Sequence, residues 1–178
     1  MTISPIVVAY DPQWPQEFEA LAAVLAAALG DLARRVHHVG STSIPDMAAK
    51  PILDIDIKLA PGIPVEAATA ALSPLGYVYA GDQGIPERYA YRNQTPAAPL
   101  CEQRAAWPSH HLYVCPHGSR ELARHLLFRD RLRRDPALRQ EYLEIKQEAL
   151  RRAEGVRQVY VDEKAMLGDA FFRRVMGD

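Results

Sequence analysis

The segment 51–60, PILDIDIKLA, constrains the fold more than any other part of this sequence. Its aliphatic side chains alternate with charged ones, Leu53, Ile55, Ile57 and Leu59 against Asp54, Asp56 and Lys58. Successive side chains of a β-strand point to opposite faces, so the pattern predicts a strand with one buried face and one polar face. The carboxylates of Asp54 and Asp56 are therefore expected to point the same way.

Strands and helices are predicted to alternate up to residue 115, with helices alone after it. Further strands are expected at 4–10, 33–40, 77–82, 87–93 and 110–115. Helices are expected at 18–29, 64–76, 119–134, 137–155 and 159–177, and residues 94–109 form a long loop. This order indicates one α/β or α+β domain over residues 1–178.

Composition excludes several classes of protein. The 178 residues are 48% hydrophobic and 24% charged, as in ordinary soluble domains. A net charge of −1 makes nucleic acid an unlikely partner, so any phosphate site must be local. Cys101 and Cys115 are expected to be reduced thiols, and no segment is apolar enough to span a membrane. We therefore expect a cytoplasmic protein.

A glycine-serine turn precedes the acidic strand. The backbone N–H groups of Gly40 and Ser41 follow a strand and are free of bulky side chains, which favours contact with a phosphate. Two like-charged carboxylates, Asp54 and Asp56, are best tolerated on one strand face if a cation lies between them. Mg²⁺ or Mn²⁺ suits such a pair when phosphates complete its shell. The simpler alternatives are an ordinary tight turn and solvated surface acids.

The segment HHVGSTSIPDMAAKPILDIDI resembles the signature of the GrpB-like (UPF0157-type) family of the nucleotidyltransferase-fold superfamily. VVAYDPQWPQEF, HHLYVCPHGS, LLFRDRLRRDP, YLEIKQEAL and VYVDEKAMLGDAFF also resemble family segments. The resemblance implies an α+β fold, with a mixed sheet, helices mainly on one face and a helical C-terminal region. It further implies that Gly40 and Ser41 hold nucleotide phosphates, that Asp54 and Asp56 bind a divalent metal, and that active members transfer a nucleoside monophosphate to an acceptor.

The sequence departs from that pattern at the third acid, which active nucleotidyltransferases usually carry on a later strand. The corresponding strand, HHLYVC, contains no acid. Alternation places His111 on the same face as the two aspartates, so His111 is the candidate third group, as metal ligand or general base. Glu87 is an alternative source of a carboxylate.

Cationic side chains that could contact phosphates are Lys50, Arg88 and Arg92, although a salt-bridged strand face explains the two arginines equally well. Lys164 and Tyr160 lie on one side of the last helix, where packing is the safer interpretation. The remaining histidines, His125 among them, are taken as structural or surface residues.

Three functions stay open. The first is a metal-dependent nucleotidyltransferase that uses a nucleoside triphosphate and an unknown small-molecule acceptor. The second is a module that binds a nucleotide, a coenzyme or a protein without catalysis, as the missing acid suggests. The third and weakest is a hydrolase using Zn²⁺ or another transition metal held by Asp54, Asp56 and His111.

Overall fold

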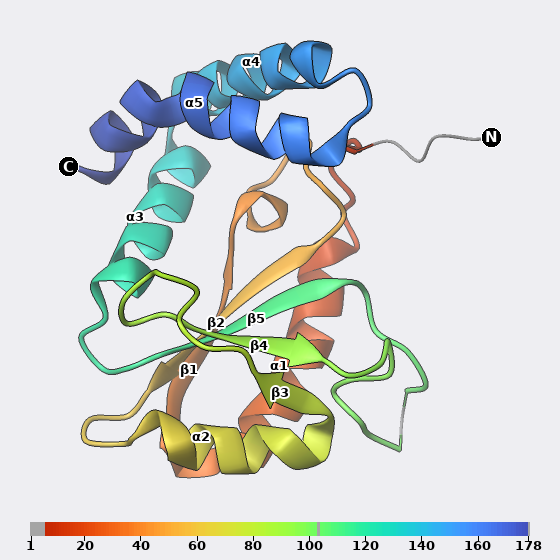
Figure 1. The fold of residues 1–178 in the computed structure, drawn as a ribbon, viewed down its shortest axis with the longest axis vertical. Coiled ribbons are helices and arrows are strands. Elements are labelled where there is room, and N and C mark those ends of the chain that lie inside the picture. The colour runs from red at the N-terminus through yellow and green to blue at the C-terminus, as the bar shows by residue number, and fades with distance from the viewer. Residues whose placement is uncertain (1–5, 103, 178) are drawn as a thin grey trace.

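The computed structural model describes residues 6–102 and 104–177, within which a five-stranded mixed sheet forms the centre (Figure 1). The strands are β1 (Ala33–Val39), β2 (Leu53–Leu59), β3 (Tyr77–Tyr79), β4 (Tyr89–Asn93) and β5 (His110–Cys115). Their order is β1-β2-β5-β4-β3, in which β2 and β5 are parallel and the other neighbours are antiparallel. The acidic strand β2 therefore lies inside the sheet.

Two helices, α1 (Trp14–Leu29) and α2 (Val65–Leu72), cover one face of the sheet. The aliphatic side chains of β2 point into this core, where Leu21 and Leu25 of α1 meet Ile55 and Ile57 and all four are fully buried. The long loop also packs here, through Ala98 and Trp107. The aspartates of β2 are thus left on the opposite face, as the alternation predicted.

The C-terminal region is helical, with α3 (Arg120–Arg134), α4 (Pro136–Ala153) and α5 (Arg157–Met176). In Figure 1, α3 rises beside the sheet to α4 and α5, which lie together beyond its end. A second hydrophobic cluster joins these helices to the segment after β1 and contains Ile44, Met47, Leu132, Tyr142, Phe171 and Val175. The predicted fold class, an α+β mixed sheet with a helical C-terminal region, is confirmed.

The prediction of a strand at 4–10 was wrong for residues 6–10. Ser4 and Pro5 lie outside the described residues. Of residues 6–10, only Val8 pairs, through an isolated antiparallel bridge to Ala49. Pro51 follows two residues later and has no N–H group with which to extend the ladder. The β-branched run therefore anchors the N-terminal segment at one point.

No helix within the described ranges has the length and apolar character needed to cross a lipid bilayer.

Candidate functional site

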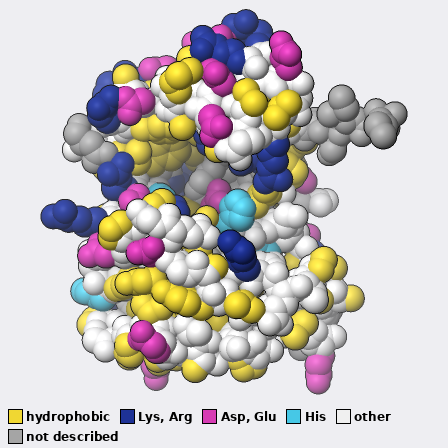
Figure 2. Space-filling view, viewed as in Figure 1, with side chains coloured by type: hydrophobic (Ala, Val, Ile, Leu, Met, Phe, Trp, Pro, Cys, Tyr) yellow, Lys and Arg dark blue, Asp and Glu magenta, His cyan; other side chains and the backbone are white. Residues whose placement is uncertain are grey.

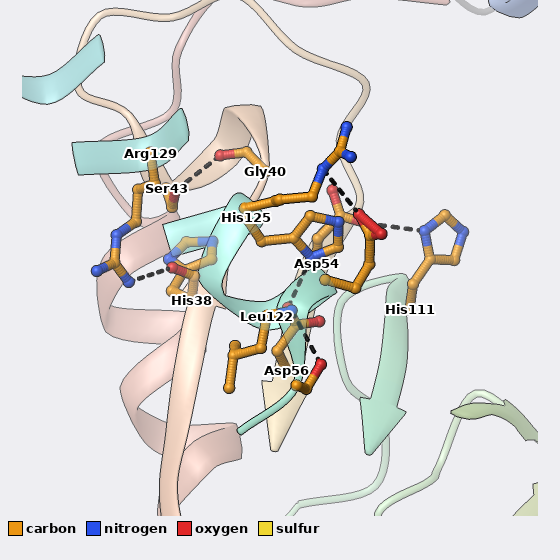
Figure 3. A network of polar contacts seen from close by, with 12 residues as sticks. His38, Gly40, Ser43, Asp54, Asp56, His111, Leu122, His125 and Arg129 are labelled. Carbon is orange, nitrogen blue, oxygen red and sulfur yellow. Dashed lines mark hydrogen bonds and ion pairs between the residues drawn. The ribbon is translucent and has the colours of Figure 1, made fainter. Parts of the chain in front are cut away.

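The turn after β1 brings the backbone against Asp54. Gly40 has φ 68° and ψ −172°, a conformation that is almost confined to glycine, and it leads into a short 3-10 turn at Ser41–Ser43. A Cβ atom at Gly40 would lie 2.2 Å from Asp54 Oδ2. Ser43 Oγ closes the turn by donating to the Gly40 carbonyl at 2.7 Å (Figure 3). Glycine is therefore required here both by conformation and by space.

Each aspartate of β2 is paired with a histidine from a different element (Figure 3). Asp54 is opposite His111 in the β2–β5 register, and His111 Nδ1 lies 2.9 Å from Asp54 Oδ1. The Asp54 side chain is 34% exposed and the His111 side chain 45% exposed. Asp56 is fully buried, and its Oδ2 lies 2.7 Å from His125 Nδ1. The two carboxylates thus share a face but have different surroundings.

His125 of α3 is a site residue that the sequence analysis missed. Burial opposes the charged form of its imidazole, but the hydrogen bond and the charge of Asp56 outweigh burial and raise the pKa of His125. The second oxygen of Asp56, Oδ1, is buried and has no hydrogen-bond partner among the described residues. Asp56 therefore has one oxygen bound to the His125 imidazole and one oxygen without a partner among the described residues.

Two adjoining pockets meet at Asp54, beneath the hollow that Figure 2 shows between the sheet and the C-terminal helices. The aromatic pocket, of about 360 Å³, is lined by Tyr113, Phe128, Tyr142 and Phe172 together with Arg88, Glu121 and His125. The lysine pocket, of about 200 Å³, is lined by Lys50, Lys146, Lys164, His111 and Tyr160. Ser41, Asp54 and Lys164 line both pockets, which makes them parts of one cleft.

Lys146 ties the C-terminal helices to the turn. Its buried Nζ lies 2.8 Å from Ser41 Oγ, donates to the Ala48 carbonyl at 2.6 Å and stands 4.6 Å over the ring of Tyr142. Burial, followed by the charge of Lys164, lowers the pKa of Lys146 to about 7. Burial also lowers the pKa values of Lys50 and Lys164. Anionic ligand groups would stabilise the charged forms of all three lysines.

The other residues proposed from the sequence divide into two sets. Arg88 lines the aromatic pocket, with its guanidinium 4.4 Å from the centre of the Tyr113 ring. Arg92 is exposed on β4 and is not among the described residues that line either pocket. Glu87 is not among the described residues that line either pocket, and its carboxylate accepts the N–H of Arg120 at the start of α3. Glu121 brings a carboxylate to the aromatic pocket instead.

The donor atoms fit a metal ion only if a ligand completes its shell. Within residues 6–102 and 104–177, no three His, Cys, Asp or Glu side chains form a group able to hold a metal ion. Asp54 is accessible from both pockets, however, and Asp56 Oδ1 has no partner in this part of the chain. Mg²⁺ is commonly held by one or two carboxylates with phosphates and waters completing its octahedron. This pair of acids is consistent with that arrangement.

Comparison with known proteins identifies the family of this chain. The family model described as "GrpB protein" matches residues 4–176. The chain belongs to the GrpB family. It is 34% identical over 167 residues to a UPF0157 protein of Pseudomonas aeruginosa, covering 94% of this chain and 64% of that protein. The GrpB crystal structure from Enterococcus faecalis matches with a TM-score of 0.75 and 29% identity, over 97% of this chain and 95% of that one.

A more distant likeness concerns the fold alone. The structure of Cid1 in complex with its short product ApU matches with a TM-score of 0.53 and 13% identity, over 82% of this GrpB-family chain and 43% of the Cid1 chain. The chain also spans less than two thirds of the length of the first UPF0157 relatives, 64% of the Pseudomonas protein and 38% of one from Bacillus subtilis.

Proposed function

We propose that this GrpB-family protein binds a nucleoside triphosphate in the cleft and transfers its nucleotidyl group to a small-molecule acceptor, with pyrophosphate as the leaving group. The observation that carries the proposal is the position of Asp54, which lies against the Gly40 turn where the lysine pocket meets the aromatic pocket. A nucleoside triphosphate matches these two pockets, because it joins a polyanionic triphosphate to an aromatic base. The likeness in fold to Cid1, solved with the UTP analogue UMPNPP, agrees with this proposal.

The lysine pocket suits the phosphates. Lys50, Lys146 and Lys164 bring three ammonium groups to one small pocket, while Asp54 is the carboxylate that lines it. Ser41, held by Lys146, begins the turn whose backbone N–H groups would approach a phosphate oxygen. The three ammonium groups would offset the negative charges of the phosphates within the pocket.

The aromatic pocket suits the nucleoside. Phe128 and Phe172, both half-buried, bring aromatic rings to the pocket, and stacking of a base on an aromatic side chain stabilises binding by about 1–3 kcal/mol. Arg88, stacked on Tyr113, adds a cation at the same wall. The pocket volume of about 360 Å³ lies within the range of small-molecule sites.

Asp54 and Asp56 would hold a divalent metal, with Mg²⁺ or Mn²⁺ favoured by an oxygen donor set. Such an ion supplies charge neutralisation at the reacting phosphate. His111 would accept the proton of the acceptor hydroxyl: with its Nδ1 engaged by Asp54, the imidazole is oriented and its Nε2 is the remaining nitrogen. Zn²⁺ would become the better candidate only if the His111 imidazole ligated the metal.

A second candidate is nucleotide or coenzyme binding without transfer. It is favoured by the pairing of Asp56 with His125, because the imidazole already occupies one oxygen of the second acid. It is also favoured by β5, which has no acid in its sequence.

The test is a calorimetric titration with ATP, GTP, CTP and UTP, each with and without Mg²⁺ or Mn²⁺. We expect metal-dependent binding of at least one nucleotide to wild type, its loss in Asp54→Asn and its retention in Asp31→Asn, a matched change at an exposed acid. Equal binding by wild type and Asp54→Asn contradicts the proposed site. Binding without pyrophosphate release, measured over a panel of sugar, alcohol and phosphate acceptors, would favour the second candidate.

A further inference from the structure

A second cavity, of about 550 Å³, lies beside the edge strand β1, between α1 and α3. We call it the arginine cavity; its principal residues are Phe18 and Ala22 of α1, Arg35 and His37 of β1, and Arg129 and Arg133 of α3. It meets the turn after β1 at Ser43, whereas the cleft meets that turn at Gly40 and Ser41. The described residues that line it line neither pocket of the cleft.

Two of its guanidinium groups are anchored to backbone carbonyl groups that flank Gly40. Arg129 donates from Nη1 to the His38 carbonyl at 3.0 Å (Figure 3). Its Nε donates to Asp130 at 2.7 Å. Arg133 donates from Nε to the Ser43 carbonyl at 2.9 Å. Both side chains come from successive turns of α3, and each guanidinium has five N–H donors, of which these contacts engage two on Arg129 and one on Arg133.

The positive charge of the cavity exceeds its negative charge. Arg35, Arg129 and Arg133 supply three guanidinium groups, while Glu19 is the carboxylate among the described lining residues. Asp130, next to Arg129, is already engaged by that arginine. Partial burial of its guanidinium and then repulsion by the charge of Arg129 lower the pKa of Arg133. An anion between the guanidinium groups would relieve this repulsion.

His37 provides a neutral polar group at the same place. Burial and the charges of Arg129 and Arg35 lower the pKa of His37 to about 4, so its imidazole is uncharged near neutral pH. Its Nε2 atom is buried and has no hydrogen-bond partner within the described chain. A ligand oxygen that donates or accepts a hydrogen bond would satisfy this nitrogen.

We propose that the arginine cavity binds a small organic phosphate, with the phosphate held by Arg35, Arg129 and Arg133 and the organic part against Phe18 and Ala22. A phosphate monoester carries between one and two negative charges at neutral pH, which matches the surplus of guanidinium groups better than a single carboxylate does. The apolar wall and the volume of the cavity give room to more than a bare phosphate ion.

A ligand in the arginine cavity would affect the cleft through the turn after β1. Arg129 and Arg133 hold the carbonyl groups of His38 and Ser43, on either side of Gly40, so a ligand that contacts these guanidinium groups also fixes the turn that lies against Asp54. This consequence rests on the proposed nucleotide site, whereas binding in the arginine cavity does not.

The experiment follows the histidine rings by ¹⁵N-detected NMR during titration with phenyl phosphate at constant ionic strength. His37 reports on the arginine cavity and His111 on the cleft, so the two sites are observed separately in one sample. We expect a saturable shift of the His37 resonances in wild type. The dissociation constant obtained from it should be about tenfold higher in Arg35→Gln and in Arg133→Gln, because each variant loses one strong charged contact. Arg35 is exposed, so its replacement leaves the core intact.

Arg134→Gln is the matched control, because it removes the same charge one residue away, outside the cavity. Lys164→Gln tests for binding in the lysine pocket and is expected to leave the His37 titration unchanged. No saturable shift of His37, or equal weakening in Arg134→Gln and Arg133→Gln, would overturn the proposal. Tighter binding of benzoate than of phenyl phosphate would overturn the assignment of a phosphate. Because nucleotide binding is scored with Asp54→Asn, either proposal can fail without the other.

Discussion

Replacing Gly40 with alanine tests whether the close approach of the turn to Asp54 builds the site. The conformation of Gly40, φ 68° and ψ −172°, costs a residue with a side chain about 1–3 kcal/mol. The added methyl group would also lie 2.2 Å from Asp54 Oδ2, so the carboxylate must rotate away from His111. That hydrogen bond is partly exposed and contributes about 0.5–1 kcal/mol. We expect Gly40→Ala to lower the free energy of unfolding by about 1.5–4 kcal/mol in total.

The measurement is urea unfolding followed by circular dichroism, alongside the nucleotide titration. Gly62→Ala is the matched control: Gly62 also has a positive φ, 75°, but a Cβ atom there would have no neighbour within 4 Å. The close approach of Gly40 to Asp54 predicts that Gly40→Ala loses more stability than Gly62→Ala and alone loses metal-dependent nucleotide binding. In an Asp54→Ala background, where the carboxylate is absent, Gly40→Ala should cost less. Equal losses in the two glycine variants, with binding intact, would refute this prediction.

Three further predictions concern the helices around the cleft. Because the pKa of His125 is raised, its contribution to the stability of the fold is complete below pH 6.5, the unfolded-state pKa, and is lost as pH rises through the folded-state pKa. The difference in free energy of unfolding between wild type and His125→Gln, measured with urea, should therefore shrink from pH 6 to 9. The pKa of Lys146, lowered to about 7 from 10.5, has the opposite sign: wild type should gain stability between pH 7 and 10.5, and Lys146→Met should flatten that rise in the same assay. Ser119→Ala should cost about 1–2 kcal/mol in thermal unfolding, because its hydroxyl caps α3 through the N–H of Leu122, whereas exposed Ser73→Ala should cost much less.

Much of the sheet side of the cleft could be predicted from local sequence. The alternation in β2 correctly placed Asp54 and Asp56 on the face away from the core, and alternation in β5 placed His111 on that face, where the strand register sets it beside Asp54. A strand fixes side-chain direction residue by residue, so the pattern carries this information directly. The strand predicted at 4–10 failed because pairing also needs a partner that can continue, which Pro51 prevents.

The helical side of the cleft could not be predicted in this way. His125 meets Asp56 across 69 residues of sequence, and Lys146 meets Ser41 across 105. Helical periodicity shows which face of a helix is apolar but not which distant group that face will meet. One signal was present: Lys146 lies one turn after Tyr142, within the apolar stripe of α4, where a buried cation needs polar partners.

The contact between Lys146 and Ser41 has a consequence for the order in which the protein acquires its parts during translation. The strands that carry Gly40, Asp54 and His111 leave the ribosome before α4 and α5, and they can pair and bury the first core while the helices are still being made. The lysine pocket closes only after residue 164 has emerged. A nascent chain of which only residues 1–145 have left the ribosome would therefore lack Lys146 and Lys164, two of the three lysines of that pocket.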